Sequence, residues 1–129
     1  MFTKKIELRF SDMDMYGHLN HAKYFSIIEA ARTELFMEDF LSLREEGILF
    51  FVVYVDCTYK KPITLGDTLV VDMDFYQISR TRFEGKYKLH DGNGKIYAEA
   101  TTVLTTFSEK LGRSVDIPEV IKNKFVAAK

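Results

Sequence analysis

Hydrophobic and polar residues alternate along several segments of this chain, and one long segment repeats with helical spacing instead. Residues 4–10 alternate charged and apolar side chains, which predicts a half-buried strand. From 21 to 46, apolar residues recur three or four positions apart, which predicts a long helix. Asn20 is the expected N-cap of this helix and Gly47 its C-terminal stop. The polar face is narrow, so we expect most of the helix to be covered.

The remainder of the chain has the pattern of a sheet. Residues 48–59 are almost all apolar, β-branched or aromatic, which predicts a central strand covered on both faces. The Asp-Gly-Asn-Gly sequence at 91–94 predicts a hairpin turn. A short closing helix is expected to begin after Asp116 as its cap. The patterns place three further strands and this helix at residues 68–78, 82–89, 96–107 and 117–126.

This order of elements predicts an α+β domain formed by residues 1–129. Its parts are one largely covered helix and a five-stranded, mostly antiparallel sheet. The most economical packing wraps the sheet around the helix. Such packing leaves the other sheet face, or an edge strand, for a partner, so we expect a homo-oligomer.

Composition and charge narrow the class of protein. Eighteen basic and nineteen acidic residues give a net charge of −1, so nothing calls for a nucleic acid or an anionic membrane as partner. The single cysteine, Cys57, excludes an internal disulfide and a cysteine-rich zinc site. The N-terminus lacks the apolar run of a signal peptide, and the apolar stretch at 48–55 is too short to span a bilayer. We therefore expect a cytoplasmic protein.

Polar side chains are concentrated between the first strand and the long helix. The first N–H groups of a helix lack intrahelical acceptors and carry the positive end of its dipole, so they can stabilise an oxyanion. A carboxylate on the preceding loop could attack a carbonyl placed there or remove a proton from water. The loop and the helix start together contain six polar residues that are candidates for a functional site: Asp12, Asp14, His18, Asn20, His21 and Tyr24.

These residues also permit simpler interpretations. Aspartates in loops before helices commonly bind backbone N–H groups, which is the role favoured for Asp12. His18 and His21 are favoured as hydrogen-bonding residues over metal ligands, because no third histidine or cysteine lies near them in sequence. A calcium-binding loop is disfavoured because Lys23 stands where a glutamate ligand would be needed.

The motif Asp-x-Asp-x-x-Gly-His-x-Asn at 12–20, followed by Tyr24 and by Glu-x-x-Arg at 29–32, resembles the hotdog-fold acyl-CoA thioesterases of the 4-hydroxybenzoyl-CoA thioesterase type. The resemblance continues through Tyr-Lys-Lys-Pro at 59–62 and Ile-Ser-Arg-Thr-Arg-Phe at 78–83, and covers roughly residues 3 to 108. It implies a five-stranded sheet around one long helix. It also implies a homodimer or homotetramer with the active site at the subunit interface.

The same resemblance assigns roles to residues. Asp14 corresponds to the catalytic carboxylate, acting as general base or nucleophile, and the N–H of His21 to the oxyanion donor. His18, Asn20 and Tyr24 are assigned to substrate binding. Arg80 and Arg82 are further candidates, since guanidinium groups suit the phosphates of coenzyme A. No metal or redox cofactor is implied, because coenzyme A is part of the substrate.

Other activities remain open at this stage. The chain combines Gly-His-x-Asn with a histidine at 21, two features that usually occur in different branches, so the acyl group is not defined. The acyl carrier could be acyl carrier protein instead of coenzyme A. A hotdog hydratase or dehydratase would need Asp-x-Asn-Pro-x-His, but this chain lacks the proline and has Leu19 where that histidine would fall. A non-catalytic acyl-thioester binder is the remaining alternative.

Overall fold

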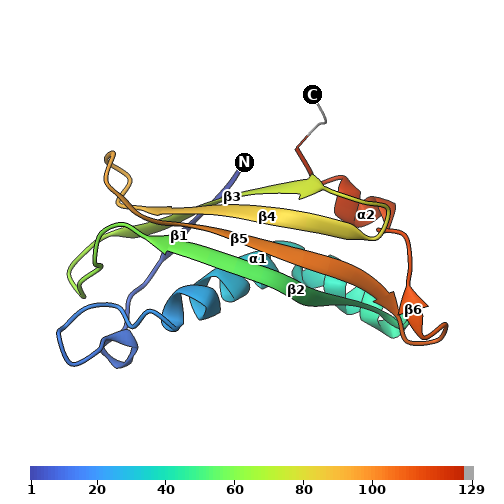
Figure 1. The fold of residues 1–129 in the computed structure, drawn as a ribbon, viewed down its shortest axis with the longest axis horizontal. Helices are drawn as coiled ribbons and strands as arrows, with labels where there is room; N and C mark the ends of the chain where they lie inside the picture. The colour runs from blue at the N-terminus through green and yellow to red at the C-terminus, as the bar shows by residue number, and fades with distance from the viewer. Residues whose placement is uncertain (127–129) are drawn as a thin grey trace.

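The computed structural model describes residues 1–126, in which one long helix packs against an antiparallel sheet (Figure 1). The loop that precedes the helix extends beyond one end of the sheet, and the C-terminal helix lies at the other end (Figure 1). The elements in chain order are β1 (Phe2–Ile6), the 3-10 turn η1 (Phe10–Asp12), α1 (Lys23–Glu45), β2 (Ile48–Tyr59), β3 (Leu69–Gln77), β4 (Arg82–His90), β5 (Ile96–Ser108), β6 (Arg113–Ser114) and α2 (Glu119–Lys122).

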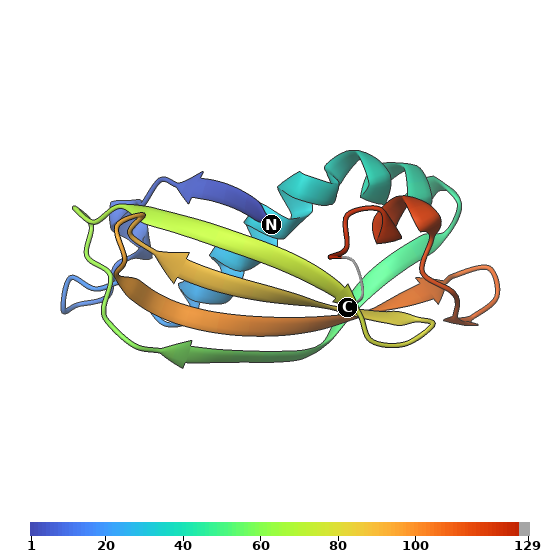
Figure 2. The ribbon, with the colours of Figure 1, turned by 90° about the horizontal axis from the view of Figure 1, so that it is seen from above.

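The sheet has the strand order β1-β3-β4-β5-β2, and every neighbouring pair is antiparallel. Figure 2 shows the strands side by side with α1 crossing beneath them. The two-residue strand β6 extends β5 at one end, so the sheet has one short strand more than predicted. The α+β class and the long helix are confirmed.

The prediction that residues 48–59 form a central strand is wrong, because β2 lies at an edge of the sheet and, among residues 1–126, pairs only with β5. Its side chains Phe51, Val52, Val53, Tyr54 and Val55 are each 44% to 52% exposed. The apolar pattern predicts burial on both faces. The described residues of the chain do not provide that cover, so the strand presents a row of apolar side chains to its surroundings.

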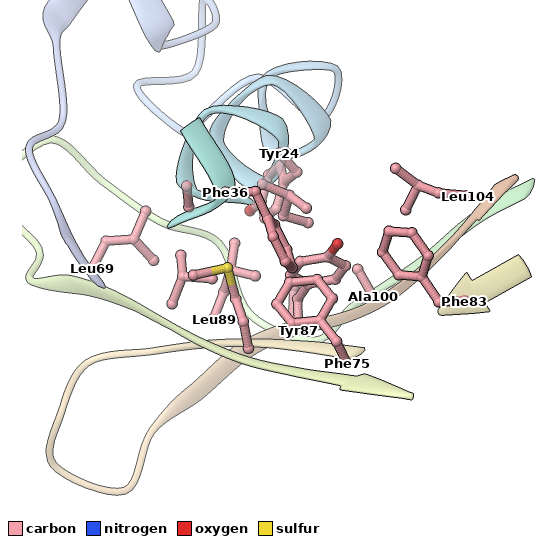
Figure 3. Packing of buried hydrophobic residues seen from close by; sticks show 14 of the residues in the cluster. Tyr24, Phe36, Leu69, Phe75, Phe83, Tyr87, Leu89, Ala100 and Leu104 are labelled. Atoms are coloured by element: carbon pink, nitrogen blue, oxygen red, sulfur yellow. The ribbon is translucent and has the colours of Figure 1, made fainter. Parts of the chain in front are cut away.

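The core lies between α1 and the inner face of β3 and β4 (Figure 3). In both strands every second residue points inward, as expected for a sheet with one covered face. Phe36 of α1 is fully buried and meets the Phe75 ring edge-on, with 5.0 Å between ring centroids. The buried apolar residues of β3 and β4 are Leu69, Val71, Met73, Phe75, Phe83, Tyr87 and Leu89, and β5 adds Tyr97, Ala98, Ala100 and Leu104.

Two elements end or begin at other residues than predicted, and in both places an aspartate pairs with an arginine. The first strand ends at Ile6, and the Asp12 carboxylate accepts hydrogen bonds from the Arg9 backbone N–H at 3.3 Å and from its guanidinium at 3.0 Å and 3.2 Å. These bonds stabilise the 3-10 turn at 10–12, and residues 7–9 of the expected strand are irregular. Asp116 does not cap the closing helix, because it pairs with Arg80 instead, and that helix has only four residues.

Candidate functional site

The loop before α1 folds back on itself around Gly17. The Asp14 N–H donates to the His18 carbonyl at 2.7 Å, and the Gly17 N–H donates to the Asp14 carbonyl at 3.0 Å. Gly17 has a φ of 77°, which a glycine adopts without strain. This turn brings Asp14 beside the start of the helix.

The Asp14 carboxylate is held by this turn. Its Oδ1 accepts hydrogen bonds from the Tyr16 N–H at 2.9 Å and from the His18 N–H at 3.1 Å. Within residues 1–126, no hydrogen bond is formed by Oδ2. One oxygen therefore fixes the orientation of the side chain, and the other is available to a water molecule or a substrate.

The backbone at the helix entry has one N–H without an acceptor. Asn20 does not cap α1 as predicted, because its Oδ1 accepts from the Ala22 N–H at 3.0 Å, one residue before the helix begins. The Lys23 N–H donates to the Asn20 carbonyl at 2.9 Å. No acceptor for the His21 N–H is found in the described part of the chain. This N–H can therefore donate to a ligand.

Asp14 and His21 line the same open cavity, whose volume is about 330 Å³. The cavity brings together four of the residues predicted from the sequence with residues that follow β2. Its lining consists of Asp14, His18, Leu19, His21, Tyr24, Tyr59, Lys60, Lys61 and Pro62. A residue with a free carboxylate oxygen and a residue whose N–H has no acceptor among residues 1–126 thus border one space. These are the kinds of group that can activate water and stabilise an oxyanion.

Tyr24 closes the inner wall of the cavity. Its side chain is only 3% exposed and meets the Tyr59 ring edge-on, with 4.7 Å between ring centroids. Burial raises the pKa of Tyr24 to about 12, with smaller contributions from the charges of Cys57, Tyr59 and Asp14. The hydroxyl therefore stays protonated near neutral pH and can act as a hydrogen-bond donor.

Sequence reasoning did not assign Tyr59 to the site. Its hydroxyl donates to the His21 carbonyl at 3.0 Å, which links the end of β2 to the helix entry. The next residue, Lys60, pairs with Glu99 at 3.1 Å, whereas no acidic partner of Lys61 is found among the described residues. The Tyr-Lys-Lys-Pro segment was noted as a family feature, but no pattern in the sequence connects Tyr59 with a backbone carbonyl 38 residues away.

The structure does not bring Arg80 and Arg82 to this cavity. Arg82 is the first residue of β4. Leu89, seven residues further along the same strand, pairs with Ala98 of β5, which in turn pairs with Tyr59 beside the cavity. At the rise of a strand, these two ends are roughly 23 Å apart. Arg80 forms an ion pair with Asp116 at the far end.

A larger hollow, of about 450 Å³, lies on the sheet face opposite α1. Its acidic side chains already have partners in the chain. Asp72 accepts from Thr3 at 2.8 Å and contacts His90 at 2.9 Å, and Asp74 lies 3.2 Å from the N-terminal amine. The larger hollow is lined by carboxylates that are already paired within the sheet, so size alone does not identify the site.

Residues 1–126 contain neither a metal-binding cluster nor a membrane-spanning helix. No group of three or more histidine, cysteine, aspartate or glutamate side chains is arranged to hold a metal ion. None of the helices in this range combines the length and the apolar character that a membrane-spanning helix needs.

Comparison with known proteins gives a consistent result. The sequence profile of the thioesterase-like superfamily matches residues 8–125. YneP of Bacillus subtilis is 30% identical over 102 residues, covering 77% of this chain and 74% of YneP. The long-chain acyl-CoA thioesterase FadM of Escherichia coli is 22% identical over 123 residues, covering 93% of each protein.

A solved structure supports the same assignment. A thioesterase from Thermus thermophilus, complexed with coenzyme A and zinc, is 30% identical, with a TM-score of 0.80 and 97% of each chain covered. The hotdog fold and the thioesterase family inferred from the motif are thereby confirmed.

Proposed function

We propose that this chain, which belongs to the thioesterase-like superfamily, hydrolyses acyl-coenzyme A thioesters to a free acid and coenzyme A. The enzyme class predicted from the motif, a thioester hydrolase, agrees with that membership. The observation that carries the proposal is the meeting of the Asp14 carboxylate and the unpartnered His21 N–H at one cavity.

The geometry supports a hydrolysis in which one group stabilises the oxyanion and another activates the nucleophile. The thioester carbonyl oxygen accepts a hydrogen bond from the His21 N–H, which stabilises the negative charge that develops on it. Asp14 Oδ2 removes a proton from water that attacks the carbonyl carbon, or attacks that carbon itself to form an acyl-enzyme that water then cleaves. Collapse of the tetrahedral intermediate breaks the carbon–sulfur bond, and the thiolate of coenzyme A takes up a proton.

Coenzyme A is proposed as the acyl carrier because it is the carrier in the name of FadM, which matches 93% of this chain. Hydrolysis of a thioester carried by acyl carrier protein would use the same groups. His18, Asn20 and Tyr24 stay proposed substrate-binding residues. His18 and Tyr24 line the cavity, whereas the side chain of Asn20 holds the helix entry.

A second copy of the chain is the proposed partner, paired along the exposed edge of β2. This strand has twelve residues, no strand of the described residues lies along its outer edge, and its side chains are apolar. Tyr59, the last residue of β2, lines the cavity, so the same edge that would pair also borders the site. A homodimer, or a homotetramer of two such pairs, would cover these side chains.

The test is thiol release from a panel of acyl-CoA esters by the wild type and by Asp14→Asn. Asparagine keeps an Oδ1 that accepts the two N–H bonds but cannot take a proton from water, so we expect the fold to be retained and kcat to fall by about 100-fold or more.

Asp91→Asn is a closely matched control. Asp91 Oδ1 accepts from the N–H groups two and four residues further on, at 2.7 Å and 3.0 Å, just as Asp14 Oδ1 does, but Asp91 does not line the cavity. Equal activity of the two variants would refute the role of Asp14. Failure of the wild type to release thiol from any ester would refute the proposed function.

A further inference from the structure

We propose that Tyr59 is a positioning residue for the oxyanion donor, holding the helix entry so that the His21 N–H faces the cavity. The inference rests on the proposed function, since it concerns the same N–H group. Tyr59 reaches this backbone from the end of β2, and its hydroxyl donates to the His21 carbonyl at 3.0 Å.

The peptide group between His21 and Ala22 is fixed at both of its ends. Its carbonyl oxygen accepts the hydrogen bond from Tyr59, and its N–H donates to Asn20 Oδ1 at 3.0 Å. The Asn20 bond is local to the turn, whereas the Tyr59 bond joins it to the sheet. The His21 N–H belongs to the preceding peptide group, whose Asn20 carbonyl accepts from the Lys23 N–H at 2.9 Å. Peptide planes held on both sides of His21 restrict rotation at this residue and so limit the directions of its N–H.

Tyr59 is itself well placed to act as a fixed anchor. Its backbone pairs with Ala98 of β5, and its ring packs edge-on against the buried ring of Tyr24. Although 45% of the residue is exposed, both contacts restrict where the hydroxyl can lie. The helix entry, where His21 and Ala22 are exposed, has no comparable packing of its own.

The bond is expected to matter for the rate and not for substrate affinity. An oxyanion donor stabilises the transition state only if it is already oriented when charge develops. A backbone freed to fluctuate by a fraction of an ångström would lose part of this stabilisation, and we expect kcat to fall about tenfold. Contacts to the rest of the substrate would be unchanged.

The first experiment compares Tyr59→Phe with Tyr97→Phe. The control also removes a tyrosine hydroxyl that donates to a backbone carbonyl, that of Thr68 at 2.9 Å, and Tyr97 lies outside the cavity. We expect Tyr59→Phe alone to lower kcat, with unchanged affinity for an S-alkyl thioether of coenzyme A, which lacks the thioester carbonyl. Unchanged kcat, or equal losses of kcat and of thioether affinity, would overturn a positioning role.

The second experiment does not depend on activity. Amide hydrogen exchange of Ala22, measured by NMR, reports whether the bond to Asn20 persists, and we expect it to become faster in Tyr59→Phe and to stay the same in Tyr97→Phe. Equal exchange in Tyr59→Phe and the wild type would overturn the inference. If the wild type releases no thiol, the proposed function fails, and the exchange rates still decide whether Tyr59 holds the helix entry.

Discussion

Replacing Gly85 with alanine tests how tightly the core beneath α1 is packed. A Cβ at this position of β4 would lie 2.3 Å from the Tyr87 hydroxyl oxygen, 2.7 Å from Cζ of the same ring and 2.9 Å from Cε1 of Phe75. Both rings are buried between the helix and the sheet, so neither can move aside freely. The absence of a side chain at Gly85 is what makes room for the Tyr87 hydroxyl.

That hydroxyl supports a small polar network in an otherwise apolar core. It shares a hydrogen bond of 2.8 Å with Thr102 and accepts one of 3.3 Å from the buried Arg32 guanidinium. Arg32 Nε has no hydrogen-bond partner in the described residues. Loss of the bond to Tyr87 would therefore leave the buried guanidinium with still fewer hydrogen bonds, which is energetically costly.

The expected cost of Gly85→Ala follows from these contacts. Overpacking a core by one methyl group costs about 1–3 kcal/mol. Displacing the Tyr87 hydroxyl weakens two buried hydrogen bonds at about 1 kcal/mol each. We therefore expect the free energy of unfolding to fall by about 3–5 kcal/mol, measured by urea denaturation with the midpoint and slope both fitted.

The double variant Gly85→Ala/Tyr87→Phe separates the two contributions. Without the hydroxyl, the shortest contact disappears, so Gly85→Ala should cost less when Tyr87→Phe is already present than it does in the wild type. A cost below about 1 kcal/mol for Gly85→Ala, or strict additivity in the double variant, would refute this account of the packing.

Two further predictions concern pH and assembly. The pKa of Tyr24 is raised to about 12, so the unfolded chain loses this proton first, and the free energy of unfolding should fall between about pH 10 and 12 by up to about 3 kcal/mol. Urea denaturation at about pH 9 and about pH 11 should show a smaller fall in Tyr24→Phe, and an equal fall would contradict the shift. Light scattering should find the wild type at twice the 15.0 kDa chain mass or more. Val53→Lys on β2 should reduce that mass to one chain while the control Leu111→Lys does not, and a monomeric wild type would refute pairing along β2.

Periodicity predicted the sheet well where one face is covered by the chain itself. On β3 and β4, alternate residues point to α1, so the pattern of side chains and the pattern of burial coincide. On β2 the apolar run indicated burial on both faces, and the strand is at an edge. A sequence records that side chains are suited to burial, but it does not record which molecule covers them. The wrong prediction therefore falls on the strand proposed to pair with a second copy.

The candidate site could be predicted only as far as it lies in one segment. Asp14, His18, His21 and Tyr24 are close in sequence, and a turn and a helix start were enough to bring them together. Tyr59 comes from 38 residues away and binds a backbone carbonyl, which carries no side-chain signature. Register in the sheet decides such contacts, and the hydrophobic pattern does not specify which strand end meets the helix entry.

Asp14 and Asp91 show why a local motif was not enough to identify function. Each N–H donates to the carbonyl four residues on, at 2.7 Å and 3.0 Å, and each carboxylate accepts two backbone N–H groups of its own turn. A glycine with positive φ stands three residues after each aspartate. The turns are therefore equivalent, and the second one only joins β4 to β5. What distinguishes Asp14 is its position beside a helix start with an unpartnered N–H, so the chemistry arises from the pairing of two elements and not from the turn alone.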